Sequence, residues 1–301
     1  MDADTLRRSL LALPAVLGLP AAHAAGRVER LPALASRHVE TRPVDVWLPP
    51  GYDGRTPHAV LYMHDGQMLF DPASTWNRQA WEVDRIATPL LAAGALRPFI
   101  VVGVWNAGPR RAAEYFPEPA LAFLEPALRA RYVEGALAGW PGGSAYLRFL
   151  VDDVKPAIDR RYATRPEREH TLVMGSSYGG LASLHALLEA PQVFGGAAAL
   201  STHWIGTFER NAEIPAALLA WMKQKLGPPG RQRLYLDRGT AGLDAKYDDA
   251  QAQVDALLRE RGLLGPDVVS RVFEGADHTE RDWQARLEQP LRFLLSGGGP
   301  R

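Results

Sequence analysis

The chain has 301 residues, of which 47% are hydrophobic and 23% are charged, and its 34 basic and 34 acidic residues leave a formal net charge of zero. This composition is ordinary for a globular protein, and the lack of a basic stripe or polybasic segment argues against nucleic acid or an anionic membrane surface as a partner. The sequence contains no cysteine, which excludes disulfides, thiolate metal ligands and a cysteine nucleophile.

The first predicted element is a secretory signal peptide over residues 1–24. The pair Arg7-Arg8 precedes the apolar run Ser9–Leu19, and Ala22-His23-Ala24 has the small residues of a cleavage site. The apolar run is too short for a transmembrane helix, and the alternative interpretation is a helix that lies on the membrane surface. We therefore expect a periplasmic or secreted protein that starts near Ala25 and has no membrane contact after cleavage.

Apolar runs and helical periodicity alternate along the rest of the chain. Strands are predicted at Val44–Leu48, Ala59–Met63, Phe99–Trp105, Thr171–Met174, Ala197–Leu200, Arg233–Asp237 and Val268–Phe273, and helices at Trp81–Ala92, Tyr146–Tyr162, Leu181–Ala190, Ile214–Leu226 and Tyr247–Arg261. This alternation predicts a single α/β domain over residues 25–301, with a mostly parallel central sheet and helices on both faces. The segment Ala107–Gly143 is predicted to be an insertion over the edge of the sheet.

A G-x-S-x-G motif lies between a predicted strand and a predicted helix. In Gly175-Ser-Ser-Tyr-Gly179, only Ser177 has glycine two residues before and two residues after it. A nucleophile at the end of a buried strand needs a sharp turn, at which side chains on either side would collide with neighbouring backbone. The following helix directs its N-terminus at the site. We therefore predict that Ser177 is a nucleophile rather than part of a structural turn.

A serine nucleophile needs a base. Where a G-x-S-x-G motif joins a strand to a helix, the catalytic residues follow along the chain in the order serine, acid, histidine. Three histidines follow Ser177. His185 lies on the helix behind the serine, and His203 follows a strand and could line the pocket. His278 lies in the loop after the last predicted strand, which is the position of the base in serine hydrolases. We predict His278 as the base.

The acid that orients the base is expected after the strand Arg233–Asp237. Asp237 ends this strand and Asp244 lies beyond the Gly239-Thr240 turn, and the position in the sequence leaves both open. Two N–H groups should form the oxyanion hole. They are predicted to be those of Tyr178, directly after the nucleophile, and of Gln67, in the loop that follows Met63.

Several of these motifs together resemble the putative esterase family of α/β-hydrolases. They are His64-Asp-Gly-Gln67, Gly175-Ser-Ser-Tyr-Gly-Gly180, Gly239-Thr240 with a following aspartate, and Gly275-Ala-Asp-His278 followed by Trp283. The resemblance covers residues 44–295. The family includes enterochelin esterase-like siderophore hydrolases and feruloyl esterase domains. The resemblance implies an α/β-hydrolase fold, no metal and no organic cofactor. It also implies Asp244 as the acid and Gln67 as the second oxyanion donor.

The sequence as a whole predicts an exported serine esterase that works through an acyl-enzyme, with a small-molecule or glycan-linked ester as its substrate. Acyl transfer on the same fold is one alternative, and a catalytically silent domain that binds a glycan or siderophore is another. A metal hydrolase using His64-Asp65 and Asp277-His278 is disfavoured because no histidine pair has metal-ligand spacing. The residues expected to contact substrate are His64, Trp140, His203 and Trp204.

Overall fold

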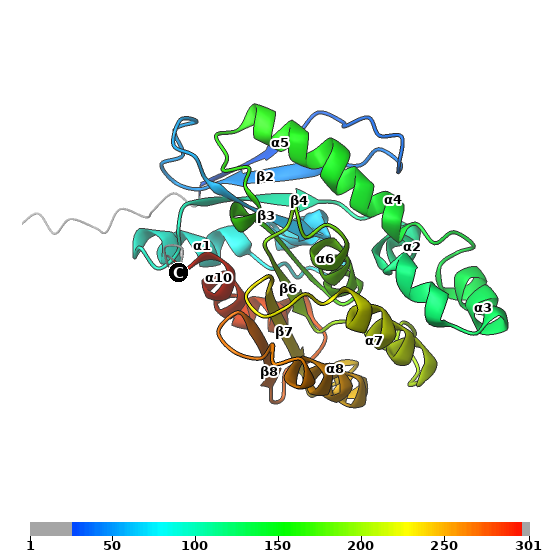
Figure 1. Cartoon of the computed structure of the whole chain (residues 1–301). Coiled ribbons are helices and arrows are strands. Elements are labelled where there is room, and N and C mark those ends of the chain that lie inside the picture. Colours follow the sequence, from blue (N-terminus) through cyan, green and yellow to red (C-terminus); the bar gives the residue numbers. More distant parts are fainter. Residues whose placement is uncertain (1–25, 297–301) are drawn as a thin grey trace, which may run out of the picture.

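The computed structural model describes residues 26–296 (Figure 1). Its strands are β1 (Arg27–Arg30), β2 (Val44–Leu48), β3 (Ala59–His64), β4 (Phe99–Val104), β5 (Thr171–Ser176), β6 (Gly196–Leu200), β7 (Arg233–Gly239) and β8 (Val268–Phe273). They form one sheet in the order β1-β2-β4-β3-β5-β6-β7-β8. From β4 to β8 all neighbours are parallel, and β2 and β1 are added antiparallel at one end. The predicted mostly parallel sheet is confirmed.

The central strands are buried on both faces, as their continuous apolar runs predict. Along β3, Val60 and Tyr62 pack into one hydrophobic core, whereas Leu61 and Met63 pack into the other. The strand that the sequence did not predict, β1, is a short edge strand whose side chains are mostly exposed. It lacks an apolar signal because it has little contact with either core.

Helices cover both faces of the sheet, as predicted (Figure 1). Their bounds are α1 (Val83–Ala92), α2 (Arg111–Tyr115), α3 (Pro126–Ala136), α4 (Gly143–Arg148), α5 (Lys155–Arg161), α6 (Tyr178–Glu189), α7 (Glu213–Lys225), α8 (Asp248–Glu260), α9 (Glu280–Arg286) and α10 (Glu288–Leu295). A π-helical segment, Phe149–Val154, joins α4 to α5. It ends two residues before Pro156, which has no N–H to continue the α-helical ladder.

The insertion between β4 and α4 lies differently from the prediction. It contains α2 and α3, and its main packing partners are α4, α6 and α7. It therefore reaches over the carboxyl ends of the parallel strands, which is where ligands bind in open α/β sheets.

The predicted signal peptide, residues 1–24, lies outside the described residues. Within residues 26–296, no helix combines the length and the apolar character needed to cross a bilayer. Whether the chain is exported therefore stays a prediction.

Candidate active site

A cavity of about 1480 Å³ opens at the carboxyl ends of the parallel strands. Its walls come from the loops after β3, β4, β5 and β6, from the insertion, and from the segment that precedes α9. Ser177, Tyr178, Gln67, His203 and His278 all line it. The structure thus brings together residues from loops that are far apart in the sequence.

Ser177 stands at a sharp turn between β5 and α6. Its backbone has φ 57° and ψ −125°, a conformation that costs energy for a residue with a side chain. A Cβ atom on Gly175 would lie 2.7 Å from the carbonyl oxygen of Gly179, and one on Gly179 would lie 3.3 Å from Asp65 Oδ2. The glycines are therefore needed for close backbone approach, as the motif predicts.

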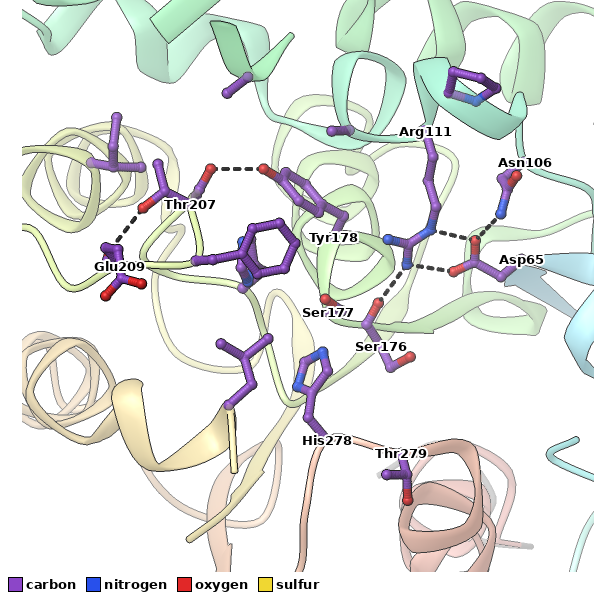
Figure 2. A pocket seen from close by; sticks show the side chains of 18 of the residues that line it. Asp65, Asn106, Arg111, Ser176, Ser177, Tyr178, Thr207, Glu209, His278 and Thr279 are labelled. Carbon is purple, nitrogen blue, oxygen red and sulfur yellow. Dashed lines mark hydrogen bonds and ion pairs between the residues drawn. The ribbon is translucent and has the colours of Figure 1, made fainter. Parts of the chain in front are cut away.

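His278 extends from its loop toward Ser177 (Figure 2). Its Nδ1 lies 2.6 Å from Oδ1 of Asp244, which is fully buried. The other carboxylate oxygen of Asp244 accepts hydrogen bonds from the Ser201 hydroxyl and from the Gly239 N–H. With Nδ1 engaged by the carboxylate, Nε2 is the ring nitrogen left for proton transfer on the cavity side.

Two opposing effects act on the carboxyl group of Asp244. Burial raises its pKa, but the hydrogen bond and charge of His278, together with the Ser201 and Gly239 donors, outweigh burial, so the pKa lies below its usual value. Asp244 is therefore ionised at neutral pH. An ionised carboxylate is the form that holds Nδ1–H of a histidine and stabilises an imidazolium.

The other candidate acid, Asp237, has a different partner. Its carboxylate pairs with Arg286 at 3.1 and 3.2 Å, and it also accepts the backbone N–H of Ser201. Arg286 in turn donates to the Ser201 hydroxyl at 2.8 Å. Asp237 therefore lies behind the His278–Asp244 pair as part of a buried network, and of the two candidate acids it is Asp244 that contacts His278.

The two predicted oxyanion donors lie on opposite loops of the cavity. Tyr178 is the first residue of α6, where N–H groups have no acceptor within the helix. Gln67 lies in a 3₁₀ turn, η1 (Gly66–Met68), directly after Asp65, whose φ is 57°. A Cβ atom on Gly66 would lie 2.5 Å from the backbone of Gly103. Close backbone approach, and not a left-handed conformation, is therefore the reason for glycine at this position.

Of the four residues expected to contact substrate, His203 lines the cavity. Its ring centroid lies 4.5 Å from that of Tyr178, and its Nδ1 lies 2.5 Å from the Tyr247 hydroxyl. Burial lowers the pKa of His203 to about 3, so the ring is neutral at physiological pH.

The expectation is not met for His64, Trp140 and Trp204, which are absent from the cavity wall. His64 is buried, and its Nδ1 bonds the Tyr146 hydroxyl at 2.9 Å. Trp204 is buried and donates to Gln251. Trp140 packs over Gly142, away from the cavity. Aromatic side chains near a site are more often core than ligand contacts, and the sequence does not show which way each one points.

Three prominent cavity residues are not among the site residues predicted from the sequence. Trp76 and Phe208 are 85% and 73% exposed and stand in the cavity wall, and Arg111 comes from the insertion. Trp76 was one of several tryptophans in the sequence, with no pattern to single it out. Exposed large aromatic side chains in a cleft are a sign of ligand contact. Within the described residues, no group of three or more His, Asp or Glu could hold a metal ion.

Comparison with known proteins adds a family to this geometry. The family model described as Putative esterase matches residues 36–294. The chain is 26% identical to the siderophore triacetylfusarinine C esterase of Aspergillus fumigatus over 250 residues. This aligned region covers 75% of this chain and 78% of that enzyme. It is 27% identical to the iron(III) enterobactin esterase of Dickeya dadantii over 168 residues, an aligned region that covers 53% of this chain and 37% of that enzyme.

A solved structure supports the fold. The IroE-like serine hydrolase from Shewanella oneidensis matches with a TM-score of 0.65 at 18% identity, over 88% of this chain and 78% of that one. The predicted α/β-hydrolase fold and the predicted ester hydrolase activity are confirmed at the level of the family. The chain belongs to the putative esterase family of α/β-hydrolases, of the enterochelin esterase-like type, and is a serine hydrolase that acts on ester bonds.

Proposed function

We propose that this protein is an exported serine esterase that uses Ser177, His278 and Asp244 as a catalytic triad. The observation that carries the proposal is the 2.6 Å bond between His278 and the buried Asp244, with His278 directed at a serine on a strained elbow. Strained backbone at a cavity is typical of functional sites.

In the proposed reaction, the Ser177 hydroxyl attacks the ester carbonyl carbon while His278 Nε2 takes its proton. The N–H groups of Tyr178 and Gln67 stabilise the negative charge on the carbonyl oxygen. His278 then gives the proton to the departing alcohol, which leaves an acyl-enzyme on Ser177. A water molecule, activated by the same histidine, releases the acid and restores the serine.

We propose a siderophore-type ester as the substrate. The two curated relatives described above are named as siderophore or enterobactin esterases. The cavity volume of about 1480 Å³ exceeds what a small alkyl ester needs, and exposed aromatic residues line it. Acyl transfer would use the same residues, with an alcohol in place of water.

The test compares the wild-type protein with Ser177→Ala on p-nitrophenyl butyrate and on a trilactone siderophore. We expect turnover of both esters and covalent labelling by a fluorophosphonate in the wild type, and loss of both in the variant. The matched control is Ser270→Ala, a serine on β8 that bonds Gln251 away from the cavity. Equal rates in wild type and Ser177→Ala would refute the proposal.

Export forms a separate part of the proposal and rests on the predicted signal peptide, residues 1–24. We expect the protein in the periplasm or medium of a bacterial host and in the cytoplasm when these residues are removed. Fractionation of cells and immunoblotting measure this. An unprocessed, cytoplasmic full-length chain would contradict export and leave the esterase proposal intact.

A further inference from the structure

Arg111, at the start of α2, connects two loops of the active site. Its Nε and Nη2 bond the two carboxylate oxygens of Asp65 at 2.6 and 2.7 Å, and Nη2 also lies 3.4 Å from the carbonyl oxygen of Ser176 (Figure 2). Asp65 precedes Gly66 and Gln67, and Ser176 precedes Ser177 and Tyr178. One guanidinium from the insertion thus joins both loops that present the proposed oxyanion donors.

The Asp65 side of this connection is firmly held. Asp65 has a left-handed backbone, which a non-glycine residue adopts only when its surroundings compensate for the cost. The compensating bonds come from Arg111, from Asn106 Nδ2 at 2.7 Å to the carboxylate, and from the Tyr115 hydroxyl, which accepts the Asp65 N–H at 3.1 Å.

The pair between Arg111 and Asp65 is a bidentate, charge-assisted contact, the strongest kind of side-chain hydrogen bond. The guanidinium also lies over the rings of Tyr115 and Tyr178, at 5.3 and 6.0 Å from their centroids. Burial raises the pKa of Asp65, but the charge and hydrogen bonds of Arg111 outweigh burial and hold the pKa below its usual value. The pair therefore stays charged at neutral pH.

We propose that Arg111 is a positioning residue that sets the spacing between the N–H groups of Gln67 and Tyr178, and so shapes the oxyanion hole. The inference rests on the proposed esterase mechanism. Oxyanion donors act only when they lie about 2.7–3.1 Å from the developing charge, so a small shift of one loop weakens catalysis without weakening substrate binding.

The competing role for Arg111 is direct binding of an anionic substrate group, since it lines the cavity. The structure favours positioning because the bidentate edge of the guanidinium is already used by Asp65. The two roles differ in what they change. Positioning affects kcat for every ester, whereas anion binding affects KM for charged esters only.

The experiment compares Arg111→Met and Arg111→Lys with Arg129→Met, an exposed arginine of the same insertion that is outside the cavity wall. Each protein is assayed on p-nitrophenyl butyrate and on 4-carboxyphenyl butyrate, which share an acyl group and differ in the charge of the alcohol. The inhibition constant of an aliphatic trifluoromethyl ketone, whose hemiketal oxyanion occupies the hole, reports the oxyanion site directly.

We expect Arg111→Met to lower kcat by about 10²-fold on both esters with little change in KM. The inhibition constant of the trifluoromethyl ketone should rise by a similar factor. Arg111→Lys keeps the charge but cannot form the bidentate contact of a guanidinium, so its decrease in kcat should be intermediate. Arg129→Met should match the wild type. Adding Asp65→Asn to Arg111→Met should cost little more than Arg111→Met alone, because both substitutions break one contact.

A loss confined to KM for the carboxylated ester, or an unchanged ketone affinity, would overturn the inference while leaving the esterase mechanism in place. Wild-type turnover equal to that of Ser177→Ala would instead refute the mechanism and the inference with it. If Arg111→Met shows no cooperative thermal unfolding, Arg111→Lys decides between the two roles by the same measurements.

Discussion

At the scale of single residues, the two aspartates near the end of β7 have separate tasks. Asp244 bonds His278, and Asp237 pairs with the buried Arg286. A carboxylate that bonds the proposed base is expected to affect the reaction, whereas one that neutralises a buried arginine affects the fold. The two substitutions to asparagine should therefore separate activity from stability.

We expect Asp244→Asn to lower kcat by roughly 10³–10⁴-fold, because the amide favours the wrong histidine tautomer. Asp237→Asn should lower the free energy of unfolding by about 3–5 kcal/mol, since it removes the carboxylate that makes the shortest ion pair of the buried Arg286, and should reduce kcat far less. Ester kinetics and urea unfolding of both variants measure this. A larger loss of kcat in Asp237→Asn than in Asp244→Asn would assign the acid to Asp237.

At the scale of elements, the turn from β5 to α6 depends on close backbone contact. A Cβ atom on Gly175 would lie 2.7 Å from the carbonyl oxygen of Gly179, which is too close for van der Waals contact. The turn and the helix N-terminus must pack this tightly to present Ser177 and the Tyr178 N–H together. A methyl group at position 175 would therefore push the turn at Ser177 apart.

We expect Gly175→Ala to destabilise the protein by about 1–3 kcal/mol and to abolish measurable turnover. Gly135→Ala is the matched control for stability, because its Cβ would meet nothing within 4 Å in α3 and alanine favours a helix by about 1 kcal/mol. Urea unfolding should thus move in opposite directions for the two variants. A stable, active Gly175→Ala would contradict the close-contact explanation of the motif.

At the scale of the whole molecule, buried histidines couple stability to pH. Burial lowers the pKa of His64 and His185 to about 4 and that of His203 to about 3. In the unfolded chain each titrates near 6.5. Between these values the unfolded state binds more protons than the folded state, so stability is fully present above pH 6.5 and falls as the pH drops toward 4.

We expect the free energy of unfolding to fall between pH 7 and pH 5, with a slope that approaches about 1.4 kcal/mol per pH unit for each buried histidine. His185 contacts Trp221 behind the active site, so His185→Gln removes one titrating group without touching the cavity. Urea unfolding at several pH values should show a shallower slope in this variant. An unchanged slope would show that His185 does not contribute.

Local patterns in the sequence were sufficient for the class of fold. Continuous apolar runs predicted the central strands, and apolar periodicity predicted α6, α7 and α8 to within a few residues, because burial on two faces or on one stripe leaves its mark on adjacent residues. The G-x-S-x-G motif predicted the turn at Ser177 for the same reason, since its steric demand falls on neighbours in the chain.

Only the tertiary structure decided which distant groups meet. Whether Asp237 or Asp244 reaches His278, whether Trp140 or Trp76 faces the cavity, and whether Arg111 joins two loops all depend on the direction of side chains from separate segments. Such contacts leave no periodic trace in the sequence, because each is set by the packing of elements far apart along the chain. The sequence by itself therefore determined the central strands, the main helices that cover them and the motif, and the tertiary structure determined the partners within the site.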